Sequence, residues 1–223
     1  MTEPRLTEIG RALADLKENE VIALVNRAIE AGRPPLGIID ELSQGMEAVG
    51  ALYKAGEYFL AELLFSGEIF KGAMSRLEPI IASAGGGRQW RGTVVMGTVK
   101  GDIHDLGKNI VTMLLQCAGF EVIDLGVDVP PERFLAALEG SRAPLVGLSG
   151  LITTAFGSMK ETVEAIRRAG MRDAVRIMIG GGPTSEEVRV HVGADFYGPD
   201  AASAVEIAGR VIGGAAEQAI PVR

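Results

Sequence analysis

The stretch TVVMGTVKGDIHDLGK, residues 93–108, decides how this chain of 223 residues folds. Its first half is an apolar run typical of a buried strand, and a helical pattern begins near Gly107. Between them a glycine-bounded loop carries His104, one of two histidines, two residues after Asp102. Open α/β sheets bind ligands where a strand passes into a helix, and a carboxylate beside a histidine can orient that ring as a metal ligand. We therefore expect an α/β fold with a ligand site at this loop.

From residue 89 onward the chain alternates short apolar runs with helical patterns. This alternation predicts a Rossmann-like parallel sheet covered by helices on both faces. For a chain of this length we favour the flavodoxin-like strand order 2-1-3-4-5. The predicted strands are 94–99, 121–125, 145–149, 175–179 and 195–197, followed by helices near 107–118, 131–139, 154–169, 185–190 and 200–212.

That strand order predicts where the ligand site lies. The loops after the first and third strands should meet at the carboxyl edge of the sheet, because the order reverses between these strands. They carry Asp102, His104 and Gly107 on one side and the Ser149–Leu151 segment on the other. The fourth strand ends in Gly180–Gly182, which would leave the adjoining edge almost bare of side chains.

The first 88 residues are helical in pattern, with apolar residues recurring three and four positions apart. Four such stripes predict a small antiparallel four-helix bundle. The segment ASAGGGR, residues 82–88, changes the composition and marks the domain boundary. We therefore expect a helical domain over 1–88 and an α/β domain over 89–223. The stripes are Ile9, Leu13 and Leu16; Val21, Leu24, Val25 and Ala28; Ile39, Leu42, Met46, Val49 and Tyr53; and Leu60, Leu63, Phe70, Met74 and Leu77.

The composition excludes several classes of protein. With 47% apolar, 23% charged and 5% aromatic residues the chain is typical of a soluble globular protein. The formal charge of −7 and the lack of a basic cluster argue against a nucleic-acid partner. Neither a signal-peptide pattern nor a membrane-length apolar run is visible, so we expect a cytoplasmic protein without a membrane partner.

The remaining cysteine and histidine offer little chemistry. Cys117 is the only cysteine, which rules out an internal disulfide, and it follows the apolar pattern of a packed core residue. His191 has no acidic neighbour nearby, and we interpret it as a surface or structural residue.

Several chemistries compete for the loop around His104. A phosphate-binding Walker loop is excluded, because the spacing from Gly101 to Gly107 is one residue too long and Asn109 replaces the required Ser or Thr. A zinc site lacks ligands beyond His104, Asp102 and Asp105. A receiver domain needs an acidic cluster at the strand end, which is missing. A simple turn closed by Asp102 and His104 does not explain the glycines and Ser149 after the other strands.

Three parts of the sequence together resemble the signature of cobalamin-binding domains: Asp102-x-His104-x-x-Gly107, Ser149-x-Leu151 and Gly181-Gly182. The helical third resembles the cap of the methyl-carrying branch, at Tyr58-Phe59-Leu60-Ala61-Glu62-Leu63, although that branch often has proline where Ala61 stands. The whole chain is similar to the small corrinoid proteins of anaerobic methyltransferase systems and to the cobalamin-binding region of methionine synthase.

The resemblance implies roles for these residues. His104 Nε2 would replace the cofactor's own benzimidazole on cobalt, and Asp102 would hold the other ring nitrogen. Gly107, Gly181 and Gly182 would leave a slot for the nucleotide tail, and the Ser149 hydroxyl would hydrogen-bond its base. The other residues expected at the cofactor are Ile103, Asp105, Leu151, Thr153 and Thr154.

The resemblance also implies how the helical domain acts. Phe59 and Leu60 would cover the upper face of the corrin and shield its methyl group from water, unless the pair belongs to the ordinary core of the bundle. Because donor and acceptor must both reach that face, the cap must move, and Gly85–Gly87 is the expected hinge.

The function implied is that of a methyl carrier, with methylcobalamin as its loaded form. Its partners would be a substrate:corrinoid methyltransferase, a corrinoid:acceptor methyltransferase acting on a folate or a thiol, and a reductive activation protein. The chain has no barrel-sized domain, so catalysis would reside largely in the partners. The alternatives are the small subunit of a cobalamin-dependent mutase, which normally lacks the Phe-Leu cap, and a cobalamin-based sensor, which normally adds a basic DNA-binding domain.

Overall fold

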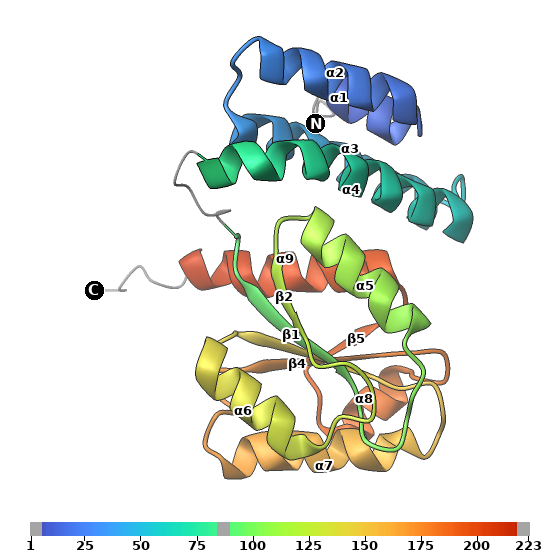
Figure 1. The fold of residues 1–223 in the computed structure, drawn as a ribbon. Helices are drawn as coiled ribbons and strands as arrows, with labels where there is room; N and C mark the ends of the chain where they lie inside the picture. The colour runs from blue at the N-terminus through green and yellow to red at the C-terminus, as the bar shows by residue number, and fades with distance from the viewer. Residues whose placement is uncertain (1–5, 84–89, 218–223) are drawn as a thin grey trace. The chain divides into compact units, whose positions relative to one another are not determined.

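A computed structural model describes residues 6–83 and 90–217, and the chain divides into two compact units, Met1–Gln89 and Trp90–Arg223 (Figure 1). The predicted boundary after residue 88 and the predicted hinge at Gly85–Gly87 lie outside the described residues. No helix of residues 6–83 or 90–217 combines the length and the apolar character needed to cross a bilayer.

The first unit contains the four predicted helices. They are α1 (Glu8–Ala14), α2 (Glu18–Glu30), α3 (Pro35–Lys54) and α4 (Leu60–Ser83), and their apolar stripes form the core. Helices α1 and α3 approach closely at two glycines, since a Cβ on Gly45 would lie 2.7 Å from the carbonyl oxygen of Gly10. Two members of the predicted stripes are exceptions. Leu16 lies beyond α1, because its backbone takes the left-handed conformation with φ 59°, and Leu60 is 45% exposed at the start of α4.

The second unit is the predicted parallel sheet, in the order β2-β1-β3-β4-β5. Strands and helices alternate as expected, with bounds within a few residues of the predicted ones. The elements are β1 (Thr93–Thr98), α5 (Leu106–Cys117), β2 (Glu121–Asp124), α6 (Pro131–Ser141), β3 (Leu145–Ser149), α7 (Ala155–Arg168), β4 (Arg176–Gly180), α8 (Glu186–Val192), β5 (Phe196–Gly198) and α9 (Ala201–Glu217).

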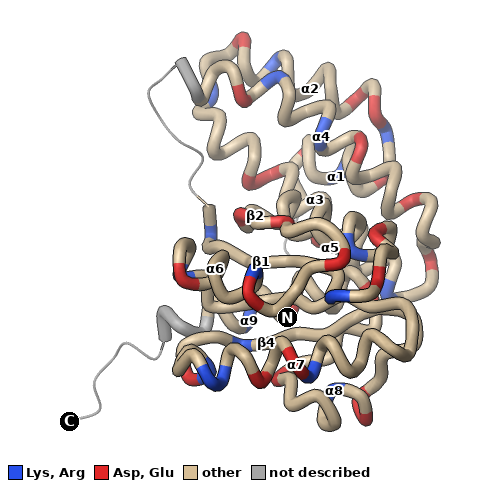
Figure 2. Tube along the Cα trace, turned by 60° about the horizontal axis from the view of Figure 1, so that its bottom comes forward, with Lys and Arg blue, Asp and Glu red and all other residues tan. Residues whose placement is uncertain are grey.

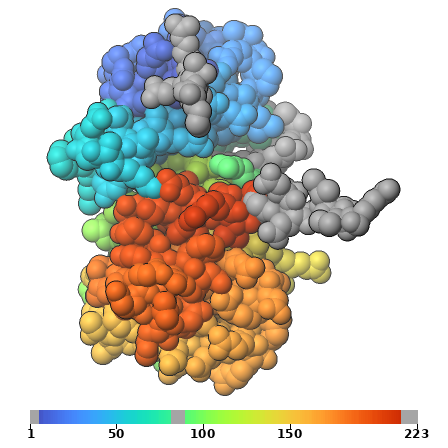
Figure 3. Space-filling view, turned by 180° about the vertical axis from the view of Figure 1, so that it is seen from behind, coloured from blue at the N-terminus to red at the C-terminus, as the bar shows by residue number. Residues whose placement is uncertain are grey.

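Two apolar layers cover this sheet, one on each face (Figure 1). Val94 and Met96 of β1 point into a cluster with α5 and α9, which includes Leu115 and Ile207. Val95 points to the opposite face, where α6, α7 and α8 close the core. Residues from the C-terminal half of the chain, in orange and red, form the face of this unit seen from behind (Figure 3).

Cys117 is buried at the end of α5, as the apolar pattern predicts. Over the described residues, basic and acidic positions are interspersed along the helices (Figure 2).

Candidate functional site

The carboxyl ends of three neighbouring strands line up at one edge of the sheet. Thr98 at the end of β1 pairs with Ser149 at the end of β3, which in turn pairs with Gly180 at the end of β4. The Val99 N–H donates to the Ser149 carbonyl oxygen at 3.0 Å. The loops after β1 and β3 therefore lie side by side, as the strand order predicts.

Asp102 joins these two loops. It is 1% exposed. Its Oδ1 accepts hydrogen bonds from His104 N at 3.0 Å and from His104 Nδ1 at 2.7 Å. Its Oδ2 accepts from the N–H groups of Leu151 at 2.6 Å and Ile152 at 3.2 Å. One carboxylate thus fixes the histidine in the first loop and the main chain of the second.

These bonds keep the Asp102 carboxylate ionised. Burial alone would raise its pKa, but the hydrogen bonds from the His104 and Leu151 main chain, the His104 ring and Ile152 outweigh burial and lower the pKa to about 2. The side chain is therefore an acceptor with no proton of its own at neutral pH.

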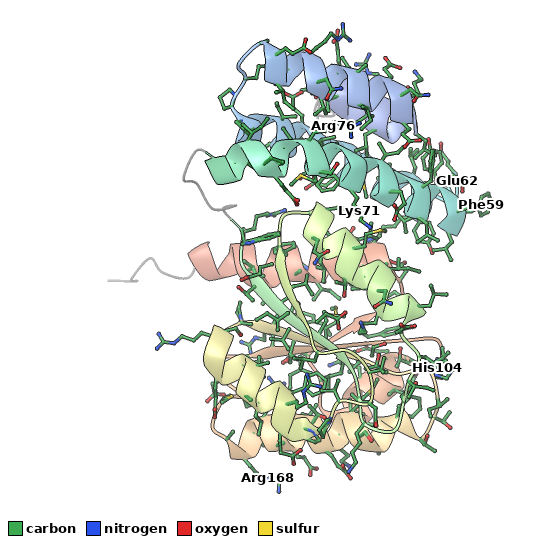
Figure 4. The ribbon with its side chains drawn as sticks, in the orientation of Figure 1. Phe59, Glu62, Lys71, Arg76, His104 and Arg168 are labelled. Carbon is green, nitrogen blue, oxygen red and sulfur yellow. The ribbon has the colours of Figure 1, made fainter. Side chains whose placement is uncertain are left out.

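The ionised carboxylate decides which nitrogen of His104 is available. A carboxylate can only accept, so Nδ1 must carry a hydrogen, and in the neutral ring the lone pair is on Nε2. The His104 side chain is 51% exposed at the edge of the second unit (Figure 4). The neutral His104 ring thus presents one nitrogen, Nε2, that can act as a ligand, and the hydrogen bond from Nδ1 to Asp102 sets this tautomer.

Exposed aliphatic side chains lie close to His104 in its own loop and in the loop after β3. Large apolar residues that remain in water are unusual when they gather, and such a patch typically marks a binding surface. They lie on the two loops that Asp102 joins. Their exposed fractions are 73% for Ile103, 69% for Leu106, 47% for Leu151 and 37% for Ile152.

The signature glycines have different surroundings. A Cβ on Gly107 would meet no atom within 4 Å, so there is open space beside the first turn of α5. Gly181 has φ +127°, and its Cβ would lie 1.9 Å from the Gly150 carbonyl oxygen. A Cβ on Gly182 would lie 3.0 Å from Leu151 Cδ1. Gly181 and Gly182 therefore let the β4 loop pack against the β3 loop, a role within the protein that sequence reasoning did not foresee.

The other predicted site residues lie in the same loops. Ser149 is half-buried, and its hydroxyl has no hydrogen-bond partner among residues 6–83 and 90–217. The Thr153 carbonyl accepts from Phe156 N at 3.2 Å, and Thr154 precedes α7 without a side-chain cap. Asp105 precedes α5, and its carbonyl accepts from Asn109 N at 2.8 Å. Their contacts with a cofactor stay predictions.

In the first unit, Phe59 and Leu60 are not core residues. Phe59 is 69% exposed and Leu60 45% exposed at the start of α4. The Phe59 N–H donates to Glu62 Oε2 at 2.9 Å, and Figure 4 shows these two side chains together. Tyr58 donates its hydroxyl to the Ala14 carbonyl at 2.8 Å. These bonds hold the start of α4 in the absence of a proline at Ala61.

Sequence reasoning missed four residues that support the His104 loop. Thr98 is fully buried, and its hydroxyl donates to the His104 carbonyl at 2.9 Å. Asp128, Asp124 and Lys108 hold the ends of the same segment. Of these four residues, only Lys108 could have been suspected from the sequence. A lysine in the first turn of a helix opposes the helix dipole and needs a partner.

Replacing Thr98 by valine removes one hydroxyl and little else. We expect the free energy of unfolding to fall by about 1.5 kcal/mol, because the carbonyl of His104 loses a buried donor. Urea denaturation of the full chain measures this change. Thr93→Val is the matched control, because the Thr93 hydroxyl binds the exposed Glu121 at the other end of β1. Equal losses in the two variants would contradict the importance of the Thr98 bond.

Both units match models of B12 binding domains. One such domain matches residues 92–206, and a second matches residues 5–78. Dimethylamine corrinoid protein 2 of Methanosarcina acetivorans is 37% identical over 91% of this chain and 94% of its own length. The chain also resembles a crystal structure of a cobalamin-binding protein from Desulfitobacterium hafniense DCB-2, with a TM-score of 0.78 and 37% identity over 92% of this chain and 98% of the other.

A second solved structure that this chain resembles is that of a complex. The methanol:cobalamin methyltransferase complex MtaBC from Methanosarcina barkeri matches with a TM-score of 0.80 and 33% identity, over 94% of this chain and 80% of the matched chain. The sequence signature, the sheet edge and these matches agree. The chain belongs to the B12-binding family of corrinoid proteins, and its cofactor is a cobalamin-type corrinoid.

Proposed function

We propose that this protein is a methyl carrier that binds cobalamin in the base-off, His-on form, with His104 Nε2 as the lower ligand of cobalt. The observation that carries this proposal is the half-exposed His104, whose Nδ1 is held 2.7 Å from a buried carboxylate. Such a carboxylate fixes the ring of a metal-bound histidine and raises its basicity. When bound, the corrinoid supplies the cobalt centre that carries the methyl group.

The surroundings of His104 fit a corrin ring. The exposed side chains of Ile103, Leu106, Leu151 and Ile152 offer an apolar surface, whose burial by a ligand is favourable. Since the macrocycle supplies the equatorial nitrogens, the protein needs to add a single donor. Gly107 stands next to open space, and the free hydroxyl of Ser149 can donate to a nucleotide base in the proposed slot.

Phe59 and Leu60 are proposed to cover the upper face of the corrin. Their exposure at the start of α4 supports this role, because a capping pair must be free of its own core to meet a ligand. An aromatic and an aliphatic side chain would exclude water from the methyl group. The hinge at Gly85–Gly87 stays a prediction, as does the division of the chain after residue 88.

The relatives' names suggest the partners. One relative is a dimethylamine corrinoid protein, and one matched structure is a methanol:cobalamin methyltransferase complex. We propose that a substrate:corrinoid methyltransferase loads this chain and that a corrinoid:acceptor methyltransferase unloads it onto a folate or thiol. A reductive activation protein would restore the cofactor after adventitious oxidation. The chain itself would bind, orient and shield, and its partners would catalyse each transfer.

The lower ligand can be identified with labelled histidine, because the chain has two histidines in all. The full chain, grown with ¹⁵N-histidine, is loaded with hydroxocobalamin and reduced by one electron for electron paramagnetic resonance. We expect each cobalt line to split into a doublet from one ¹⁵N nucleus. His104→Ala should abolish the doublet, and His191→Ala should retain it. A triplet from the ¹⁴N of benzimidazole in the wild-type chain would reject the proposed lower ligand.

The carrier role is tested on the same protein loaded with methylcobalamin. Transfer of the methyl group to a thiol or folate, in the presence of an acceptor methyltransferase, supports it. Adenosyl radical formation would instead support a mutase subunit, and light-dependent DNA binding would support a sensor.

A further inference from the structure

The 124–130 loop, which runs from the last residue of β2 to the start of α6, binds the His104 segment at its N-terminal end. Asp128 Oδ1 accepts from Gly101 N at 2.7 Å, and Asp128 N donates to the Asp102 carbonyl at 2.9 Å. Val99 and Val129 form a parallel bridge beside these bonds. One residue of the 124–130 loop therefore binds two successive main-chain residues, Gly101 and Asp102, shortly before His104.

The 124–130 loop also binds the His104 segment at its C-terminal end, through Asp124 and Lys108. Lys108, in the first turn of α5, is 3% exposed, and its Nζ lies 2.5 Å from Asp124 Oδ2 and 2.8 Å from Asn109 Oδ1. The other oxygen of Asp124 accepts from Gly126 N at 2.9 Å. This ion pair is partly buried, because the Lys108 side chain is 2% exposed and that of Asp124 is 32% exposed, and a buried ammonium left without its partner would be costly. The pair therefore fixes where α5 begins relative to the 124–130 loop.

The backbone of Asp128 is consistent with a constrained loop. Its φ of 51° lies in the left-handed region, which residues other than glycine occupy at a cost. Asp and Asn bear this cost more readily than most residues. The conformation places the carboxylate and the N–H of one residue on two successive groups of the His104 loop.

We propose that Asp128, Asp124 and Lys108 are positioning residues for the axial ligand. By holding residues 101 and 108 on either side of His104, they set the direction in which Nε2 meets the metal. The inference rests on the proposed function of His104. Within residues 6–83 and 90–217, the hydrogen bonds of Asp128 and Lys108 do not reach the His104 ring, so each acts through the backbone or through α5.

The test measures how firmly the histidine is held on cobalt. The ¹⁵N-histidine-labelled chain, loaded with hydroxocobalamin and reduced by one electron, is titrated with unlabelled imidazole. Displacement of His104 converts the doublet into a triplet. For Asp128→Gly, which keeps the left-handed backbone but loses the acceptor, we expect displacement at about tenfold lower imidazole than for the wild type. Lys108→Met should show a similar decrease, and Asp128→Asn, which keeps an acceptor oxygen, should resemble the wild type.

A variant at the other edge of the sheet serves as the control for a general loss of stability. Arg172 pairs with Asp195 at 2.8 Å, ahead of β5, and Arg172→Met removes that cation without touching the His104 loop. Its imidazole titration should match the wild type even if the free energy of unfolding falls.

Two outcomes would overturn the positioning role without touching the proposed function of His104. One is an imidazole titration of Asp128→Gly that matches the wild type, and the other is a decrease for Arg172→Met as large as that for Asp128→Gly. If Lys108→Met does not fold, the titration of Asp128→Gly by itself decides the question. A wild-type chain without the doublet rejects the proposed function, and the positioning role with it.

Discussion

Asp102→Asn is expected to lower the free energy of unfolding at pH 7 by at least about 2 kcal/mol and to remove the histidine from cobalt. Asp102 accepts from four N–H groups, at His104 N, His104 Nδ1, Leu151 and Ile152. An amide offers one acceptor oxygen and one NH₂ group in the same place. At least one buried donor must then face another donor, which costs roughly 1 to 3 kcal/mol for each unsatisfied group.

The orientation of the new amide decides how the site fails. If the NH₂ group faces His104, Nδ1 must accept, and the ring proton moves to Nε2, where it blocks coordination. If the NH₂ group faces the N–H groups of Leu151 and Ile152, the loop after β3 loses its anchor. Both orientations predict loss of the ¹⁵N doublet described above.

The stability difference should depend on pH in a defined direction. The folded-state pKa of Asp102 is lowered from 3.8 to about 2, so its contribution is complete above about pH 4 and is lost as the pH falls through 2. This shift corresponds to about 2 kcal/mol. We expect the gap between wild type and Asp102→Asn to be constant from pH 7 to about pH 4 and to narrow below it.

Urea denaturation followed by tryptophan fluorescence measures this gap, because the chain's one tryptophan, Trp90, begins the described part of the second unit. Asp195→Asn is the control for the cobalt signal, since Asp195 also accepts a main-chain N–H, from Ile177 at 2.7 Å, but at the opposite edge of the sheet. A stable Asp102→Asn chain with a normal doublet would contradict the anchoring role.

The strand order could be predicted from the sequence because each buried strand is a short apolar run separated from the next by a helical pattern. The ends of the strands could not, since hydrogen bonds to main-chain atoms decide them. Strand β1 begins at Thr93, one residue earlier than predicted, because the Glu121 N–H donates to the Gly92 carbonyl at 2.9 Å and extends the pairing. At its other end Val99 makes an isolated bridge to Val129.

The candidate site likewise has parts that could be predicted from the sequence and parts that could not. The pairing of Asp102 with His104 could be predicted, because residues two apart in a tight loop must lie close together. The roles of Thr98 and Asp128 could not, because their partners are the His104 carbonyl and the Gly101 N–H, which leave no pattern of side chains. The Lys108–Asp124 pair joins residues 16 positions apart, and only the fold brings them together.

Gly181→Ala is expected to disrupt the site from the side of β4 and to lower the free energy of unfolding by at least about 3 kcal/mol. The new Cβ would lie 1.9 Å from the Gly150 carbonyl oxygen, and φ +127° is a conformation that alanine rarely adopts. Backbone strain and overpacking each cost roughly 1 to 3 kcal/mol. Because the obstacle is main chain rather than a flexible side chain, one loop must move.

That movement would reach the histidine through a short chain of contacts. Gly150 precedes Leu151, whose N–H donates to Asp102 at 2.6 Å, and Asp102 holds Nδ1 of His104 at 2.7 Å. We therefore expect Gly181→Ala to weaken hydroxocobalamin retention as well as stability, measured by urea denaturation and by visible absorption after gel filtration. Gly182→Ala is the matched control, because its Cβ would meet the flexible end of Leu151 at 3.0 Å, which can turn aside. If the two variants lost stability equally, packing between the loops would not explain why glycine stands at position 181.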